Sequence, residues 1–312
     1  MTLSREQIMD IKEKTSLNRL VVGNSLQTYI GKSDELAYGL FSVVPERAIW
    51  VRYGAEDGID VVEKYTVVLG ELEVEYEGNK FLMQEGETLD ASEYPELLTF
   101  YSKWGTEILV EMTESIYESN FRDTEIVQRD ATAIEKVDGY TFHHCVRIKD
   151  YSIELWKKMN QPIERSRALI WGAYFHDIGK LAVPLEILNK PGKLTPDEWE
   201  IMKAHTTKGA EMIRNHELPW LRDSAFVVEQ HHERYDGKGY PYGLKGDEIS
   251  LEASIVSVVD SFDAMTTNRV YRDAMSMDEA IQEIVNGRGT QFHPKVVDEF
   301  LKLLQGQQFI WK

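Results

Sequence analysis

The chain has 312 residues, of which 42% are hydrophobic, and it carries a formal net charge of −18. This length favours two domains, and the negative charge argues against binding to nucleic-acid polymers or to anionic membranes. No apolar run reaches the roughly eighteen residues of a membrane helix, and the polar N-terminus does not resemble a secretory signal. Cys145 is the single cysteine, which excludes an internal disulfide and predicts a cytoplasmic protein.

Charge and histidine are unevenly distributed along the chain. Residues 1–115 hold 22 Asp and Glu against 10 Lys and Arg, and all eight histidines lie after residue 142. The two parts of the chain therefore have different chemistry.

After a short helix expected at residues 4–16, the first part contains short stretches rich in β-branched and aromatic residues. These are AIWVRYG (48–54), KYTVVLG (64–70), ELEVEYEG (71–78), KFLMQEG (80–86) and TEILVEM (106–112). Gly70, Gly78 and Gly86 separate them as turns. The pattern predicts an all-β domain at residues 1–112, built as a barrel or sandwich.

The stretch LGELEVEYEGNKFLMQEGETL, residues 69–89, resembles the core hairpin of cupin-type jelly rolls. Cupin enzymes hold their metal with histidines, and this segment has none. A cupin-like sensory or dimerisation module is therefore expected rather than a cupin enzyme.

Residues 113–138 are predicted to form a linker helix. Residues 113–137 lack Pro and Gly, and sparse apolar residues stand on a charged background. The helix either pairs with that of a second copy or is solvated, and the sequence does not decide between the two.

Residues 139–312 are predicted to be all-α. Helical spacing is found in residues 142–159, 165–177, 195–215, 223–232, 251–266 and 276–285. Two of these segments begin with capping boxes, Thr195 with Glu198 and Ser276 with Glu279.

Seven potential metal ligands lie on or at the ends of separate predicted helices. They are His144, His176, Asp177, His205, His231, His232 and Asp260. Two of them, Asp177 and Asp260, follow apolar stretches, where a buried carboxylate needs compensation that a metal ion supplies. Imidazole with carboxylate suits Fe, Mn or Zn better than Ca or Mg. Seven ligands exceed one tetrahedral site and suit two octahedral ions, an arrangement that hydrolyses phosphate esters.

The motif HDIGK, residues 176–180, resembles the signature of the HD-superfamily metal phosphohydrolases. HHERYDGKGYP (231–241), followed by DSFDAMT (260–266), resembles that of the HD-GYP branch, bacterial phosphodiesterases of cyclic dinucleotides. The similarity runs from about Tyr140 to Leu304 and includes ILNKPGKLTPDEWEIMKAH, NRVYR and GRGTQFHP.

The resemblance implies a role for each matching residue. One metal ion would be held by His144, His176, Asp177 and Asp260. Asp177 would bridge to a second ion held by His205, His231 and His232. Lys180 would lie near the scissile phosphate, Asp263 would orient the attacking water, and Arg269 and Arg272 would contact phosphate. Gly239 and Tyr240, in the loop that names the branch, would shape the site and help to contact substrate or signalling proteins.

Some family members hold a third metal through a glutamate four residues before the first histidine. Tyr140 occupies that position here, so two divalent ions are expected, iron or alternatively manganese. Among other candidates, His216 is expected at the surface, His293 is expected to shape the fold, and Cys145 is expected to pack.

The resemblance implies a cytoplasmic phosphodiesterase that hydrolyses cyclic di-GMP to pGpG or onward to GMP, under control of the N-terminal domain. One alternative substrate is 3′,3′-cyclic GMP-AMP. Another alternative is a weakly active or inactive metal-bearing receptor that signals through the GYP loop, and a third is a nucleotidase acting on mononucleotides. A homodimer is expected from the family's habit and from the linker helix.

Overall fold

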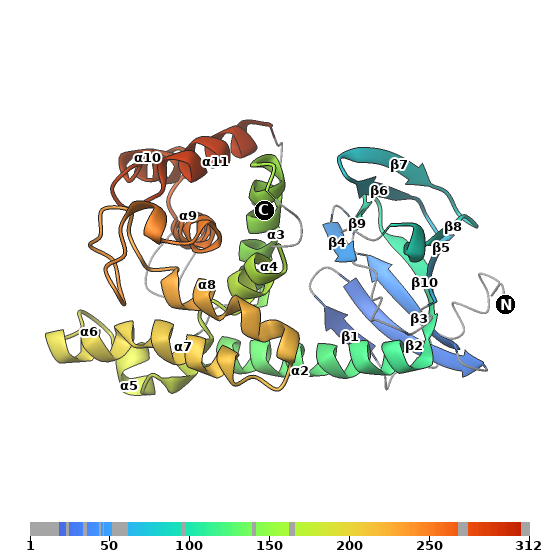
Figure 1. Ribbon diagram of the computed structural model, residues 1–312, viewed down its shortest axis with the longest axis horizontal. Coiled ribbons are helices and arrows are strands. Elements are labelled where there is room, and N and C mark those ends of the chain that lie inside the picture. Colours follow the sequence, from blue (N-terminus) through green and yellow to red (C-terminus); the bar gives the residue numbers. More distant parts are fainter. Residues whose placement is uncertain are drawn as a thin grey trace. The chain divides into compact units, whose positions relative to one another are not determined.

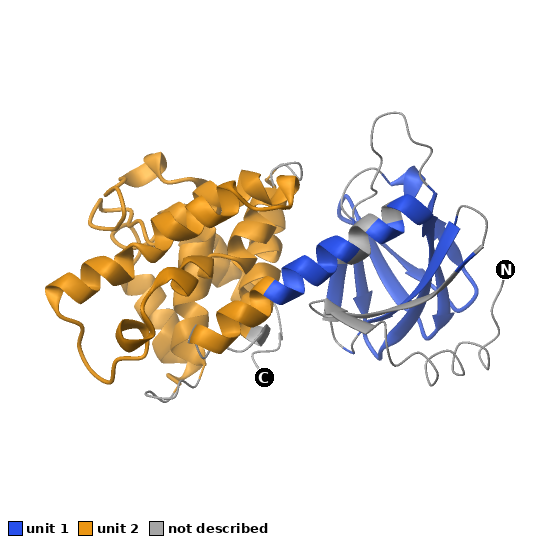
Figure 2. Cartoon of the chain, turned by 90° about the horizontal axis from the view of Figure 1, so that it is seen from below, with its two compact units in different colours: residues 1–129 blue, residues 130–312 orange. Residues whose placement is uncertain are grey.

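The computed structural model divides into two compact units, residues 1–129 and 130–312 (Figures 1 and 2). The structure describes residues 19–22, 25–33, 36–43, 45, 47–51, 62–94, 98–138, 142–161, 166–267 and 274–306. The helix expected at residues 4–16 lies outside these residues, as do Tyr140, Arg269 and Arg272.

Antiparallel strands form two sheets in the first unit. The six-stranded sheet has the order β1-β2-β3-β10-β5-β8, and the four-stranded sheet has the order β4-β9-β6-β7. The strands are Arg19–Val22 (β1), Ser25–Ser33 (β2), Leu36–Val43 (β3), Arg47–Val51 (β4), Glu63–Leu69 (β5), Leu72–Tyr76 (β6), Asn79–Met83 (β7), Thr88–Asp90 (β8), Leu98–Ser102 (β9) and Thr106–Thr113 (β10). A 3-10 turn, Ala91–Glu93 (η1), follows β8.

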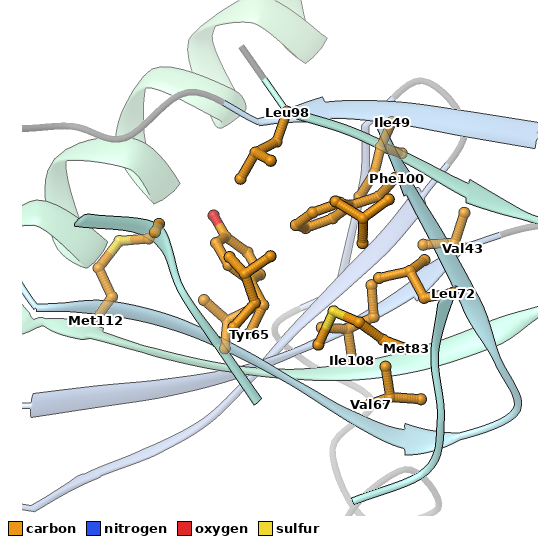
Figure 3. Packing of buried hydrophobic residues seen from close by; sticks show 14 of the residues in the cluster. Val43, Ile49, Tyr65, Val67, Leu72, Met83, Leu98, Phe100, Ile108 and Met112 are labelled. Atoms are coloured by element: carbon orange, nitrogen blue, oxygen red, sulfur yellow. The ribbon is translucent and has the colours of Figure 1, made fainter. Parts of the chain in front are cut away.

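The core of the first unit comes from every second residue along the strands, because successive side chains point to opposite faces of a sheet. Tyr65 and Val67 in β5 are buried, and so is Phe100 in β9. The rings of Tyr65 and Phe100 meet edge to face, with centroids 5.0 Å apart (Figure 3). The predicted β class is confirmed for this unit, and the five predicted strands coincide with β4, β5, β6, β7 and β10.

Helix α2, Glu114–Asp138, covers the segment that was predicted to connect the two parts of the chain. Its first turns belong to the β unit, where Tyr117 is buried in the core beside Gly39 of β3. A Cβ at Gly39 would lie 2.9 Å from the Tyr117 ring, so the absence of a side chain leaves room for that ring. The boundary between the units falls after Arg129, within the same helix.

The second unit is helical. Its helices are Phe142–Lys158 (α3), Ser166–Tyr174 (α4), Leu185–Leu188 (α5), Pro196–Lys203 (α6), His205–Arg214 (α7), Ala225–Gln230 (α8), Leu251–Thr266 (α9), Met277–Asn286 (α10) and Pro294–Gly306 (α11). The 3-10 turns Ile178–Ala182 (η3), Pro219–Ser224 (η4) and Gly246–Glu248 (η5) connect some of them. Across the described residues, no helix is long and apolar enough to cross a membrane.

The predicted helix at residues 195–215 is two helices, α6 and α7, that meet at Ala204. No residue of α6 is buried, whereas α7 buries His205, Gly209 and Ile213 along one side. The break therefore separates an exposed helix from one that packs in the core. Both predicted capping boxes, at Thr195 and Ser276, are confirmed.

Candidate metal centre

The seven predicted ligands come from five places in the helical unit. His144 is on α3, His176 and Asp177 follow α4, and His205 begins α7. His231 and His232 follow α8, and Asp260 is on α9. A close approach of backbones brings two of these places together, since a Cβ at Gly179 in η3 would lie 1.8 Å from the carbonyl oxygen of His205. Only glycine permits this contact.

Three of the histidines are oriented by a backbone carbonyl three residues earlier. Nδ1 of His176 lies 2.8 Å from the oxygen of Ala173, and His205 and His231 make the same contact at 2.7 Å. A carbonyl oxygen can only accept a hydrogen bond, so Nδ1 must donate. In the neutral ring this leaves the Nε2 lone pair available to a metal ion.

These side chains form two groups that could each hold a metal ion. One group consists of Asp177, His205, His231 and His232, and the other of His144, His176 and Asp260. Within each group the potential ligand atoms all lie within 4.8 Å of one another. The structure thus brings together all seven residues that the sequence predicted.

Asp177 lies between the two groups. Its Oδ1 is 3.5 Å from Nε2 of His205, and its Oδ2 is 3.2 Å from Nε2 of His176. Each carboxylate oxygen therefore faces a histidine of a different group, which is the geometry that a bridging ligand requires. Asp260 faces both histidines of its own group, with Oδ1 3.6 Å from Nε2 of His144 and 3.7 Å from that of His176.

Burial and neighbouring histidines keep most of these imidazoles neutral. Burial, with His205 next in importance, lowers the pKa of His232 to about 3, and burial together with His232 holds the pKa of His231 well below its usual value. For His176, burial opposes protonation, but the adjacent Asp177 carboxylate outweighs it and raises the pKa to about 9. The Asp177 group is therefore rich in neutral nitrogen donors around one carboxylate.

Buried polar atoms at this centre fit a divalent cation. Nε2 of His205, Nε2 of His231 and Oδ1 of Asp177 are buried and have no hydrogen-bond partner among the described residues. Leaving such atoms unsatisfied costs about 1–3 kcal/mol each. A metal ion would compensate that cost, and the donor set of imidazole and carboxylate suits Fe, Mn or Zn.

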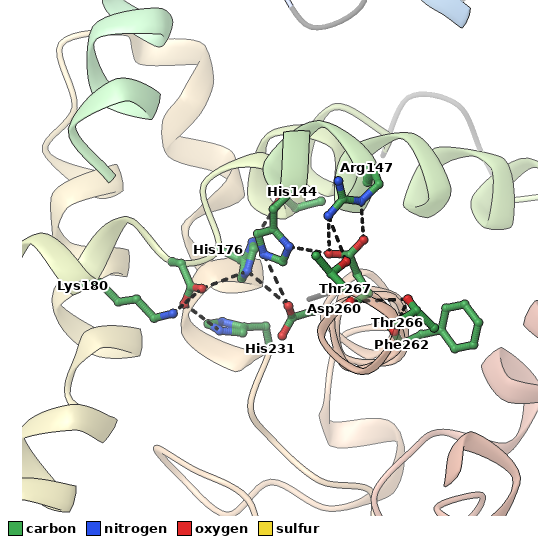
Figure 4. Close-up of polar contacts among 12 residues, drawn as sticks. His144, Arg147, His176, Lys180, His231, Asp260, Phe262, Thr266 and Thr267 are labelled. Atoms are coloured by element: carbon green, nitrogen blue, oxygen red, sulfur yellow. Dashed lines mark hydrogen bonds and ion pairs between the residues drawn. The ribbon is translucent and has the colours of Figure 1, made fainter. Parts of the chain in front are cut away.

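Lys180 adds a positive charge at the edge of the centre. Its Nζ lies 2.8 Å from Oδ2 of Asp177, and its side chain is 13% exposed (Figure 4). Turn η3 holds it three residues after Asp177, so that both side chains lie on one side of the turn. The ammonium therefore places a positive charge beside the buried Asp177 carboxylate.

Asp263 lies on the same face of α9 as Asp260, three residues further along, and contacts the outer side of His144. It is fully buried, its Oδ2 is 2.7 Å from Nδ1 of His144, and its Oδ1 accepts a hydrogen bond from Nε of Arg147 at 2.5 Å. Both of its oxygens are engaged by His144 and Arg147. Arg147 was not predicted as a site residue, although its i+3 spacing from His144 on a helix is a local signal for it.

The loop that follows the histidine doublet packs against the centre. The Tyr240 ring has its centroid 4.9 Å from that of His232, and the Tyr240–Pro241 peptide is cis. A Cβ at Gly239 would lie 2.3 Å from the backbone nitrogen of Arg234. Glu233 holds the far side of the loop by accepting hydrogen bonds from the backbone N–H of Tyr242 at 2.7 Å and of Leu244 at 3.0 Å.

His216 is buried, and the expectation of a surface residue is wrong. Its Nε2 lies 2.8 Å from Oδ2 of Asp130 on α2, and its Nδ1 accepts a hydrogen bond from Leu218 N–H at 3.1 Å. Asp130 is 86 positions away in the sequence, which is why local patterning did not reveal the pair. Cys145 is buried, as expected for a packing residue. Nε2 of His293 lies 3.3 Å from Oδ1 of Asp247, and His293 belongs to neither ligand group.

The helical unit thus brings two histidine–carboxylate groups together, with Asp177 facing a histidine of each. The family model described as "HD domain" matches residues 126–296. The chain belongs to the HD domain family, and the similarity recognised from the HDIGK motif is confirmed.

Curated relatives share the helical part of the chain. The cyclic di-GMP phosphodiesterase response regulator RpfG of Xanthomonas campestris is 39% identical over 60% of this chain and 50% of its own length. A cyclic di-GMP phosphodiesterase of Thermotoga maritima is 39% identical over 62% of this chain and 54% of its own. A 3′3′-cGAMP-specific phosphodiesterase of Vibrio cholerae is 32% identical over 57% and 34%. This chain spans about half the length, or less, of these relatives.

Among solved structures, a cyclic GMP-AMP specific phosphodiesterase of V. cholerae matches 59% of this chain and 49% of its own, with a TM-score of 0.48 and 20% identity. A Cupin_2 domain from Enterobacter cloacae matches 29% of this chain and 96% of its own, with a TM-score of 0.25 and 14% identity.

Proposed function

We propose that the protein is a metal-dependent phosphodiesterase that hydrolyses cyclic di-GMP to pGpG or onward to GMP. The observation that supports this most directly is Asp177, whose two oxygens face histidines of different ligand groups at 3.5 and 3.2 Å. Two ions held this way suit the in-line displacement of a phosphate ester. We propose iron as the native metal, with manganese as the alternative; the mixed imidazole and carboxylate donors suit Fe, Mn or Zn.

The metal ions, when bound, would supply positive charge for a phosphate group and lower the pKa of a water molecule. The chain's own residues prepare the site for them. The carbonyls of Ala173, Met202 and Val228 fix three imidazoles with Nε2 directed inward. Asp177 spans the two groups, and Asp260 faces both histidines of its own group.

Lys180 would contribute a second positive charge at the reacting phosphate. Its ammonium is held 2.8 Å from Asp177 and is mostly shielded from solvent, where a charge acts more strongly than in water. It would stabilise charge that develops on the phosphate or on the leaving oxygen. This local cation also offsets the net charge of −18, which otherwise repels an anionic substrate.

The remaining assigned contacts complete the substrate site. Tyr240, beside His232, and Gly239 would line its edge. Arg269 and Arg272, which follow α9 outside the described residues, would contact phosphate, as their match to the family motif implies. The same loop, residues 237–241, would contact signalling proteins.

The names of the relatives support a cyclic dinucleotide as the substrate class. Relatives named as cyclic di-GMP phosphodiesterases are 34–40% identical to the chain. Relatives named as specific for 3′3′-cGAMP are 32–36% identical, so 3′,3′-cyclic GMP-AMP is the second candidate substrate. A receptor with little turnover is the competing class, and Lys180 argues against it because binding alone does not need a group at the leaving oxygen.

We further propose that residues 1–112 form a cupin-like sensory or dimerisation domain, that residues 113–138 link it to the phosphodiesterase domain at 139–312, and that the protein is a homodimer. The β6–β7 hairpin lies within the cupin-like sequence stretch, and α2 runs from the β core at Tyr117 to the Asp130–His216 pair. Light scattering on the full chain tests the dimer, and a mass of one chain would contradict it.

The test of the activity uses full-length protein purified without oxygen and loaded with Fe(II) or Mn(II). It is mixed separately with cyclic di-GMP, 3′,3′-cyclic GMP-AMP and a mononucleotide, and products are separated by chromatography. We expect pGpG or GMP from cyclic di-GMP, lost in Asp177→Ala and retained in Asp298→Ala, which changes an exposed carboxylate. Absence of product from protein with two bound ions would reject the enzyme and favour the receptor.

A further inference from the structure

His144 is held differently from His176, His205 and His231. Its Nδ1 lies 2.7 Å from Oδ2 of Asp263, a carboxylate that is fully buried. His176, His205 and His231 instead direct Nδ1 at a neutral backbone carbonyl. Of these four rings, His144 is therefore the one whose outer nitrogen contacts a charged group.

Arg147 completes this arrangement from one turn further along α3. Its Nε donates to Oδ1 of Asp263 at 2.5 Å and its Nη2 donates to Oδ2 at 2.9 Å. Nη2 also contacts Oγ1 of Thr267 at 3.3 Å (Figure 4). The two-point contact fixes the plane of the carboxylate, because a guanidinium fork matches both oxygens at once.

The same imidazole contacts two aspartates of α9 through its opposite nitrogens. Asp260 Oδ1 lies 3.6 Å from Nε2 of His144, and Asp263 Oδ2 lies 2.7 Å from Nδ1. Helical i, i+3 spacing places both carboxylates on one face of α9. The inner one belongs to the ligand group, whereas the outer one is turned away from it by Arg147.

A carboxylate that accepts the outer N–H of a metal-binding histidine fixes the ring and makes its free nitrogen a stronger donor. Arg147 donates to both oxygens of Asp263, so its guanidinium places a positive charge beside the buried carboxylate and fixes its orientation. The Asp177 group has no equivalent among the contacts of the described residues.

We propose that Asp263 and Arg147 are positioning residues that strengthen metal binding at the His144–His176–Asp260 position, while the Asp177–His205–His231–His232 position does not depend on them. The two metal positions accordingly differ in what sets their affinity. The inference rests on the proposed two-metal site and deepens it.

The experiment measures metal binding directly, without substrate. Metal-free full-length protein is titrated with Mn(II), and free Mn(II) is followed by electron paramagnetic resonance. Two backgrounds isolate the positions, since His232→Ala disables the Asp177 position and His144→Ala disables the other. We expect Asp263→Asn to weaken binding by about 10–100-fold in the His232→Ala background and by less than about twofold in the His144→Ala background.

Two further variants separate positioning from general damage. Arg147→Lys keeps the positive charge but loses the two-point contact, so it should weaken the same position by a smaller factor than Asp263→Asn. Arg288→Gln removes a comparable pair with Asp298, with both contacts at 2.7 Å, that lies exposed at the surface. That control should leave both affinities unchanged.

Equal weakening in both backgrounds, or no weakening in either, would overturn the inference. If Asp263→Asn does not fold, as judged by circular dichroism, the Arg147→Lys result decides, and an unchanged affinity there would reject the role. The outcome is separate from the proposed activity. A chain that binds Mn(II) with this asymmetry but hydrolyses no cyclic dinucleotide would uphold the inference and reject the phosphodiesterase.

Discussion

Nζ of Lys180 lies 2.8 Å from Oδ2 of Asp177, the same oxygen that lies 3.2 Å from Nε2 of His176. One carboxylate oxygen therefore meets both a histidine of the proposed metal site and the cation proposed to act on substrate. Oδ1 faces the other ligand group. Replacing Lys180 would therefore remove no potential metal ligand from either group. Charge stabilisation and metal binding should be separable by mutation.

We expect Lys180→Met to lower the rate of cyclic di-GMP hydrolysis by about 10²–10³-fold, the effect of removing one preorganised group that stabilises developing charge. Bound metal should remain at two ions per chain, measured by mass spectrometry of the metal. Lys302→Met, at a lysine whose side chain is 60% exposed, serves as the control. Loss of metal together with activity would show that Lys180 acts on the ligands and not on the substrate.

Gly179→Ala should loosen the centre through packing. The new Cβ would lie 1.8 Å from the His205 carbonyl oxygen and 2.6 Å from the backbone nitrogen of Gly209, so η3 and α7 must separate. We expect the free energy of unfolding to fall by about 3 kcal/mol, with weaker Mn(II) binding at the position that uses His205.

Gly209→Ala introduces a milder clash at the same helix contact and should lower the free energy of unfolding by less. Its Cβ would meet Val228 at 2.9 Å and the Gly179 backbone nitrogen at 3.0 Å, so smaller shifts suffice and the loss should be about 1 kcal/mol. Urea unfolding of the two variants tests the order. A Gly179→Ala protein as stable as the wild type would contradict the close approach of these backbones.

Stability of the metal-free protein should pass through a maximum near pH 6.5, the ordinary pKa of histidine. Burial, with His205 next, lowers the folded-state pKa of His232 to about 3. The stabilisation that comes from this neutral ring is therefore fully present above pH 6.5 and is lost as the pH falls toward 3. For His176, the effect of burial is outweighed by Asp177 and the pKa rises to about 9. The stabilisation that comes from this protonated ring is therefore fully present below pH 6.5 and is lost as the pH rises through 9.

Urea unfolding in the presence of a chelator, followed by tryptophan fluorescence, measures the free energy of unfolding on the acid limb and the alkaline limb of this pH profile. Each limb should have a slope of up to about 1.4 kcal/mol per pH unit for each histidine involved. His232→Gln should flatten the acid limb, and His176→Gln should flatten the alkaline one. A profile unchanged by either substitution would show that these groups have ordinary pKa values in the folded chain.

The ligand set could be predicted from the sequence because each ligand lies in a short motif. His176 and Asp177 are adjacent, as are His231 and His232, and each pair follows a helix. Helix length, capping and apolar spacing are also local properties, which is why α9 was predicted at residues 251–266 as observed. Seven potential ligands on or beside the predicted helices of one unit indicate a metal site, because isolated buried polar residues would not gather there by chance.

Long-range partners could not be predicted in the same way. The direction of Asp263 depends on Arg147, 116 positions earlier, and the burial of His216 depends on Asp130, 86 positions earlier. Strand β3 was missed for a related reason, since it contains Gly39, and that glycine is explained only by the Tyr117 ring that packs on it. Such residues acquire their roles from contacts that local patterns do not encode.

Glu233→Ala should release the loop beside the histidine doublet without removing a ligand. The carboxylate of Glu233 is buried and accepts hydrogen bonds from the N–H groups of Tyr242 and Leu244. Each lost contact costs about 1–3 kcal/mol locally, so hydrogen exchange of these two amides should accelerate by roughly 10–100-fold. Affinity for Mn(II) should stay within about twofold, because the ligand rings are oriented by other carbonyls.

Glu248→Ala is the matched control for this loop. Its carboxylate accepts a hydrogen bond from the Lys245 N–H at 2.9 Å in an exposed capping box, so only exchange of the Lys245 amide should increase. Hydrogen exchange with mass spectrometry or nuclear magnetic resonance distinguishes the two patterns. If Glu233→Ala leaves the Tyr242 and Leu244 amides as protected as before, the close packing of Gly239 on the Arg234 backbone holds the loop without Glu233.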